Sequence, residues 1–236
     1  MKTYFYERTA YKLSEQPVPQ YFITLDDFFD FNLVVDQPGS TPVPVLLAES
    51  ICSRLADVEM FAFLIEDTRK RHRLDKDGET RIAILTRSFL VGYLGAARAL
   101  LDSCATALSI LYQLPLKPGE RTFANPEFWQ YFVGRVPNVQ RRYHPMRLFF
   151  NEVMRWCNET ADRIPPIQVL HNQFGMYPAR DSHLRVADDP NADLALMDAE
   201  LLRLNWINAL DLHLRWKPNL SMLCEKVCVD IQSSLK

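Results

Sequence analysis

Five histidines, five cysteines and the acids and arginines near them are the residues that could do chemistry in this sequence. None of the nucleophile, phosphate-loop, metalloprotease or dinucleotide motifs (G-x-S-x-G, a glycine-rich phosphate loop, H-E-x-x-H, G-x-G-x-x-G) is present. Cys224 and Cys228 are four residues apart, which is not the C-x-x-C spacing of zinc or redox sites, and no second pair completes such a site. Glu-x-x-His pairs, which build di-iron sites in helical bundles, are also missing. The sequence therefore predicts no metal and no cofactor.

One polar constellation remains, in residues 156–171, where the sequence reads WCNETADRIPPIQVLH. It carries Arg163 and His171, with Pro165 and Pro166 between them. A histidine titrates near neutral pH and can act as a general acid or base, and the guanidinium of an arginine offers a fork to a phosphate. The two prolines predict that a helix ends before this segment.

Together with ARALLDSCA at residues 97–105 and the Leu-Pro loop that follows, this constellation resembles bacterial proteins of the HEPN-like superfamily. The resemblance covers residues 80–235. It implies an antiparallel helical bundle that forms a homodimer. Active members of that superfamily cut RNA without a metal, using an arginine and a histidine in a cleft shared by two protomers.

The resemblance implies that Arg163 contacts the phosphate or oxyanion and that His171 is the general acid/base. Asn158, Glu159 and Asp162 would be the polar residues that orient them. The chain departs from the family pattern, because seven residues separate Arg163 from His171 and the two prolines break the helix that holds such a pair on one face. We therefore expect a non-catalytic protein that acts through dimerisation or a protein partner. The first alternative is a metal-independent ribonuclease.

A second alternative is a small-molecule binder with an aromatic pocket in the bundle. The residues that would line it are Trp129, Phe132, Tyr143 and Trp156. Large apolar side chains at helical spacing are more often core than pocket, so we expect these four to be buried.

These residues must be positioned by helices, of which residues 81–113 form the central one. Its small and polar residues fall on one arc and nearly all others are apolar, which predicts burial on two or three sides, with Leu100 and Leu101 both buried. The apolar run is long enough for a membrane span, but Arg98 and Asp102 disfavour one and fit a surface ion pair.

Helical spacing predicts further helices over 44–74, 127–133, 192–216 and 220–231, and one beginning at Pro145. The apolar face of this last helix is predicted to contain Leu148, Phe149, Val153, Trp156 and Cys157. Pro218 is expected to interrupt the C-terminal helical region. A short hairpin is predicted between residues 167–170 and 184–186.

Residues 1–40 are rich in aromatics and differ from the rest, which predicts a β hairpin or an extended arm packed on a helical bundle of residues 41–236. The fold class is therefore mainly α. The basic run 69–73 is interpreted as a solvated helix end, so RNA is a less favoured partner than protein. A formal net charge of -2 gives no reason to expect a membrane partner, and residues 1–16 lack the apolar core of a signal peptide, so we expect a cytoplasmic protein.

Overall fold

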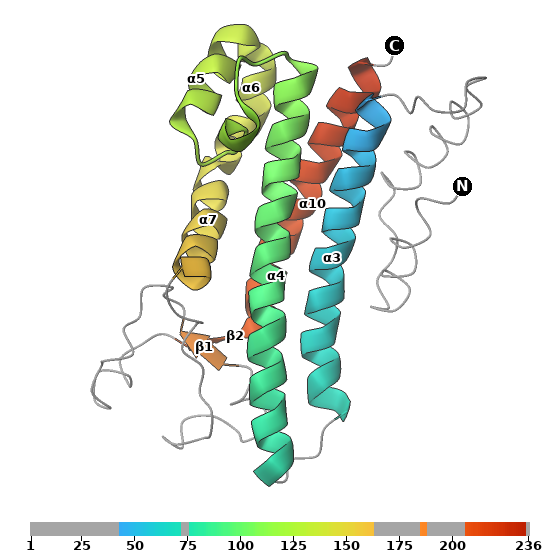
Figure 1. Ribbon diagram of the computed structural model, residues 1–236, viewed down its shortest axis with the longest axis vertical. Coiled ribbons are helices and arrows are strands. Elements are labelled where there is room, and N and C mark those ends of the chain that lie inside the picture. Colours follow the sequence, from blue (N-terminus) through green and yellow to red (C-terminus); the bar gives the residue numbers. More distant parts are fainter. Residues whose placement is uncertain (1–42, 72–75, 163–184, 188–205, 235–236) are drawn as a thin grey trace, which may run out of the picture. The chain divides into compact units, whose positions relative to one another are not determined.

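The computed structural model describes residues 43–71, 76–162, 185–187 and 206–234 (Figure 1). This part is mainly α, as the sequence predicts. The predicted hairpin or arm over 1–40 lies outside the described residues, so its structure and its packing on a helical domain stay predictions. The described elements are α3 (Val43–Arg71), α4 (Lys76–Leu111), η1 (Pro118–Glu120), α5 (Pro126–Arg135), α6 (Pro137–Tyr143), η2 (His144–Met146), α7 (Arg147–Asp162), β1 (Arg185–Ala187), β2 (Trp206–Asn208) and α10 (Ala209–Ser234).

The helices predicted over 44–74, 81–113 and 127–133 are confirmed as α3, α4 and α5, within a few residues at each end. Asn125 caps α5, because its side-chain oxygen accepts a hydrogen bond from the Glu127 amide at 3.0 Å, and Pro126 occupies the first helical position. At the end of α3, Lys70 pairs with Glu66 and Arg71 pairs with Asp67. Of the basic run 69–73, Lys70 and Arg71 are therefore each paired with an acid one turn back along the same helix.

The end of α4 is closed by a Schellman motif centred on Gln113. The Leu114 amide donates to the Ser109 carbonyl at 2.9 Å, and the Gln113 amide donates to the Ile110 carbonyl at 3.2 Å. Gln113 has a φ of 51°, a left-handed conformation that glycine usually supplies at this position. Pro115 follows and prevents the helix from continuing.

Two predictions for the C-terminal region are wrong, those for the helix over 192–216 and for Pro218. The helix expected over 192–216 does not include Trp206–Asn208, which forms β2 and pairs antiparallel with β1, with Val186 opposite Ile207. The strand expected at 184–186 is present as β1, which pairs with β2. Its predicted partner, residues 167–170, lies outside the described residues, so the hairpin stays a prediction. Trp and Ile favour strands, and in so short a run helical and strand spacing are hard to distinguish.

Pro218 does not interrupt the helix, because α10 runs through it from Ala209 to Ser234. A proline removes its own amide hydrogen bond to the carbonyl four residues earlier, here that of Leu214. The side chains of Leu214 and Pro218 are both exposed, so this carbonyl lies on a side of the helix that water reaches.

The chain divides into two compact units, and each has α4 at its centre. Among the described residues, unit 1 consists of 43–60, 96–152 and 218–234. In unit 1, α4 meets α3 where the Ser50 hydroxyl donates to that of Ser103 at 3.4 Å. It meets α5 where the rings of Tyr112 and Phe132 lie 5.8 Å apart.

Unit 2 consists of the described residues 61–71, 76–95, 153–162, 185–187 and 206–217. Here Tyr93 of α4 stacks on Trp216 of α10, with ring centroids 5.9 Å apart. The Cys157 thiol of α7 donates to the Leu94 carbonyl at 3.1 Å. Each unit therefore packs α4 against several helices, as its broad apolar surface predicts.

The burial pattern of α4 confirms the prediction made for Leu100 and Leu101, which are both fully buried. Ser109 lies on the small and polar arc yet is buried, and its hydroxyl donates to the Ala105 carbonyl at 2.8 Å.

On α7, Phe149, Val153, Trp156 and Cys157 are buried as predicted. Leu148 is not: its side chain is 83% exposed, so placing it on the apolar face was wrong.

Within the described residues, one helical stretch, Ile84–Leu111, is long and apolar enough to cross a membrane by length and composition. Of its most apolar window, 56% is buried inside the protein, as in the core helix of a globular fold. Arg98 and Asp102 form the predicted ion pair within it, with Nε and Oδ2 3.9 Å apart and both side chains about two-fifths exposed.

Two glycines of α4 in unit 2 give a matched test of how closely α3 and α4 approach. A Cβ atom added to Gly92 would lie within 2.9 Å of three ring atoms of Phe61, whereas one added to Gly95 would meet nothing within 4 Å. We predict that Gly92→Ala lowers the free energy of unfolding by about 1–3 kcal/mol, because Phe61 must move. Gly95→Ala should raise it by about 0.5–1 kcal/mol through helix propensity. Urea denaturation measures both, and equal effects would contradict the close approach.

Candidate functional site

The residues that the family resemblance singles out are only partly described. Arg163 and His171 lie outside the described residues, so whether they meet stays a prediction. Asn158, Glu159 and Asp162 belong to the last turns of α7, and only their helical backbone is described. α7 is described as far as Asp162; residues 163–166, where the helix is predicted to stop, lie outside the described residues.

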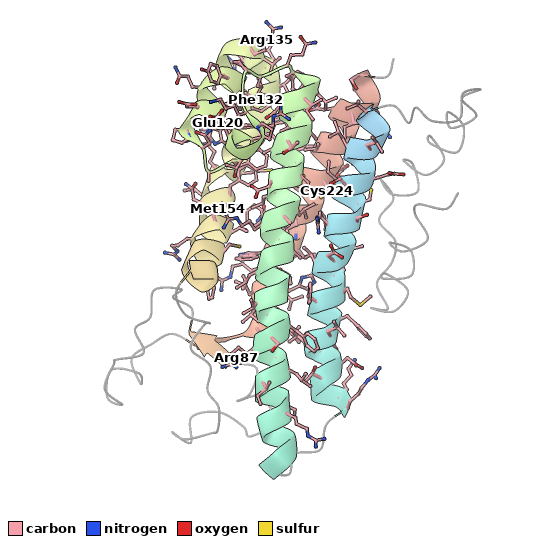
Figure 2. The ribbon with its side chains drawn as sticks, in the orientation of Figure 1. Arg87, Glu120, Phe132, Arg135, Met154 and Cys224 are labelled. Atoms are coloured by element: carbon pink, nitrogen blue, oxygen red, sulfur yellow. The ribbon has the colours of Figure 1, made fainter. Side chains whose placement is uncertain are left out.

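The four aromatics considered for a pocket are buried side chains of the core. Trp129, Phe132 and Tyr143 pack together in unit 1, where the rings of Phe132 and Tyr143 lie 5.8 Å apart. The Trp129 indole donates to the Phe123 carbonyl at 2.8 Å, so its polar atom is satisfied. Trp156 is buried in unit 2. Ring stacking extends this core, with Phe123 and Phe150 centroids 4.2 Å apart, and Figure 2 shows Phe132 on α5.

All five cysteines are free and buried. In unit 1 the thiols of Cys104 and Cys224 are hydrogen-bonded to each other, and burial, followed by this bond, raises the pKa of Cys224. Burial and the nearby Cys224 also raise the pKa of Cys228. Because the thiolate is the reactive form, these are core side chains rather than nucleophiles.

The described residues place a different polar group in the core of unit 1, the carboxylate of Asp230. It is only 4% exposed and lies near the C-terminal end of α10. Arg142 of α6 forms an ion pair and hydrogen bond with its Oδ1. The Tyr143 hydroxyl, also from α6, donates to its Oδ2 at 2.6 Å. Each carboxylate oxygen therefore has a partner, as a buried charge requires.

Two further side chains complete what we call the Asp230 network, which consists of Asp230, Arg142, Tyr143, Tyr112 and Lys226. The Lys226 ammonium donates to the Arg142 carbonyl at 2.8 Å and thus joins α10 to α6 a second time. Tyr112, at the end of α4, has side-chain hydrogen bonds with both Asp230 and Arg142. The network therefore ties three helices of unit 1 together.

Both phenols of the network are held in the neutral form. Burial, followed by the charge of Asp230, raises the pKa of Tyr112 to about 12 and that of Tyr143 further. A phenol with so high a pKa is a hydrogen-bond donor throughout the physiological range and cannot act as a base there. Arg142 is half-exposed, with 41% of its side chain accessible, and Tyr112 and Lys226 are partly exposed, so solvent reaches the edge of the network.

A smaller polar site lies on α4 in the same unit. Burial raises the pKa of the Asp102 carboxyl, while a hydrogen bond with Thr122 and the charge of Arg98 act in the opposite direction. Among the residues the structure describes, no group of three or more His, Cys, Asp and Glu side chains could hold a metal ion. Neither polar site of unit 1 has the ligand set of a metal centre.

Comparison of this chain with protein-family models, with curated proteins and with solved structures finds no match.

We predict that removing the cation of the Asp230 network lowers the free energy of unfolding more than removing its anion does. Arg142→Met leaves a buried carboxylate without its cation and should cost about 3–5 kcal/mol. Asp230→Asn keeps the volume and leaves a half-exposed guanidinium that water can solvate, so it should cost less, about 1–3 kcal/mol. Arg98→Met, which breaks a half-exposed pair, is the control and should cost about 0.5 kcal/mol or less. Urea denaturation measures the free energy of unfolding of each variant. If Arg142→Met lowers it no more than Arg98→Met does, the network does not stabilise the protein.

Proposed function

We propose that this chain is an intracellular protein with an antiparallel helical bundle of HEPN-like architecture, and that it acts through dimerisation or a protein partner rather than by catalysis. The observation that carries its non-catalytic part is the buried and fully paired carboxylate of Asp230. A catalytic carboxylate must reach the proton that it transfers. Asp230 is 4% exposed, and Arg142 and Tyr143 occupy its two oxygens. This is the arrangement of a structural carboxylate.

The exposed apolar residues support action through a partner. Leu148 of α7 is 83% exposed and Leu214 of α10 is 65% exposed. The aromatics of residues 128–143 offer little exposed surface for dimerisation, because Phe128, Trp129, Phe132 and Tyr143 are buried and Tyr131 is 40% exposed. The homodimer is therefore proposed on the family resemblance.

The test of dimerisation is light scattering of the purified chain across a micromolar dilution series. We predict a mass twice the 27.4 kDa of the chain. A strictly monomeric species at every concentration would remove the homodimer and, with it, any cleft shared by two protomers. Action through a different protein would then be the remaining form of the proposal.

The alternative function is a metal-independent ribonuclease that uses Arg163 and His171. We predict that the purified protein does not cleave single-stranded RNA, because the two residues are separated by a proline pair and no helical repeat holds them on one face. The wild-type chain and Arg163→Ala should leave the RNA equally intact. Cleavage by the wild type that disappears in Arg163→Ala would overturn the non-catalytic proposal.

A further inference from the structure

One long segment of the chain carries arginines and no acidic residue, although the formal net charge of the chain is -2. No aspartate or glutamate occurs between Glu127 and Glu152. The same segment contains four arginines and one histidine: Arg135, Arg141, Arg142, Arg147 and His144. It covers most of α5, all of α6 and η2, and the start of α7, all in unit 1. Figure 2 shows Arg135 at the end of α5.

The backbone of this segment places several exposed side chains on one side of a helical path. Tyr143, His144 and Arg147 all have right-handed helical φ and ψ angles, so the helical path continues from α6 through η2 into α7. Arg141, His144 and Leu148 are spaced by three and four residues, which places them on one side of that path. All three are exposed, and Leu148 is the most exposed large apolar residue that the structure describes. We call Arg141, His144, Arg147 and Leu148 the basic stripe.

The two edges of the basic stripe are fixed by contacts with the core. On one edge Arg142 is bound to Asp230. On the other, the Arg147 guanidinium lies over the Trp129 ring, 5.1 Å from its centroid, in a cation–π contact. An arginine already held in place loses less conformational entropy when it binds a ligand. Arg147 is therefore a pre-organised member of the basic stripe.

We propose that the basic stripe binds an acidic segment of a partner protein, with carboxylates paired to Arg141 and Arg147 and an apolar side chain packed on Leu148. The inference rests on the proposed action through a partner and names the chemistry of that partner. Guanidinium groups pair with carboxylates in a bidentate fork, and arginine next to an apolar anchor is typical of protein interfaces.

The composition of the stripe favours a polypeptide over the other polyanions. Nucleic-acid surfaces add aromatic rings on which bases stack, and the basic stripe contains none apart from the imidazole of His144. Binding in a lipid interface relies on a broad apolar face, whereas Leu148 is a single leucine among cations. One apolar anchor next to two arginines matches a short acidic peptide with one apolar residue.

The experiment measures binding of the full chain to two synthetic polypeptides at low salt, poly-glutamate and a random copolymer of glutamate and tyrosine, by fluorescence anisotropy. Arg141→Glu should weaken both interactions about tenfold or more, because it replaces attraction by repulsion. Arg87→Glu, at an exposed arginine of α4, is the control and should change neither by more than about twofold. Leu148→Ser should weaken binding of the copolymer several-fold and leave poly-glutamate binding unchanged. Leu214→Ser, at the exposed leucine of α10, should change neither.

If the wild-type chain binds neither polypeptide, the inference is wrong. It is also wrong if Arg141→Glu and Arg87→Glu weaken binding to the same extent. Tighter binding of poly-uridylate RNA or of phosphatidylglycerol vesicles through the same residues would overturn it in favour of a nucleic acid or a membrane. Light scattering and the RNA cleavage assay use neither polypeptide. A dimer that fails to bind them therefore refutes the acidic partner and leaves the proposed function standing. Circular dichroism confirms that each variant is folded.

Discussion

A carboxylate buried near the C-terminal end of a helix is unfavourable in two ways, and unit 1 depends on how these costs are offset. Burial removes the hydration of Asp230, and the helix dipole of α10 disfavours an anion near that end. The guanidinium of Arg142 and the phenol of Tyr143 offset both. Because they are consecutive residues of α6, the charge of one aspartate fixes the rotation of that short helix about its axis. That rotation decides which residues of α6 and of the following turn of α7 face water.

The long elements were predictable because their burial follows a helical repeat. In α4 the apolar surface is so broad that it requires several neighbours, and the contacts with α3, α5, α7 and α10 follow from that. The errors come from residues whose local preference is overruled. Pro218 disfavours a helix locally, yet α10 continues through it, with buried residues on both sides of the proline in the sequence. Leu148 continues the apolar spacing of α7 but falls one position outside the buried arc.

The site was less predictable than the fold, since its members are far apart in the sequence. Asp230 is separated from Tyr143 by 87 positions and from Arg142 by 88, so no local spacing relates them. The available signal was weak: an aspartate within an otherwise apolar repeat, and a tyrosine directly after two arginines. Motif comparison favours residues that are close in sequence, and the family resemblance therefore selects Arg163 and His171. A carboxylate held by a distant helix leaves no such motif.

Both units contain buried thiols, so chemical modification of these thiols can measure how each unit opens. Cys52, Cys104, Cys224 and Cys228 belong to unit 1 and Cys157 to unit 2, and all five are buried. An alkylating reagent modifies a buried thiol only when the surrounding structure opens. The rate of modification at Cys157 therefore reports opening of unit 2, while the four other thiols report opening of unit 1. Peptide mapping of partly alkylated protein would show whether the units open together or separately, with no label added to the chain.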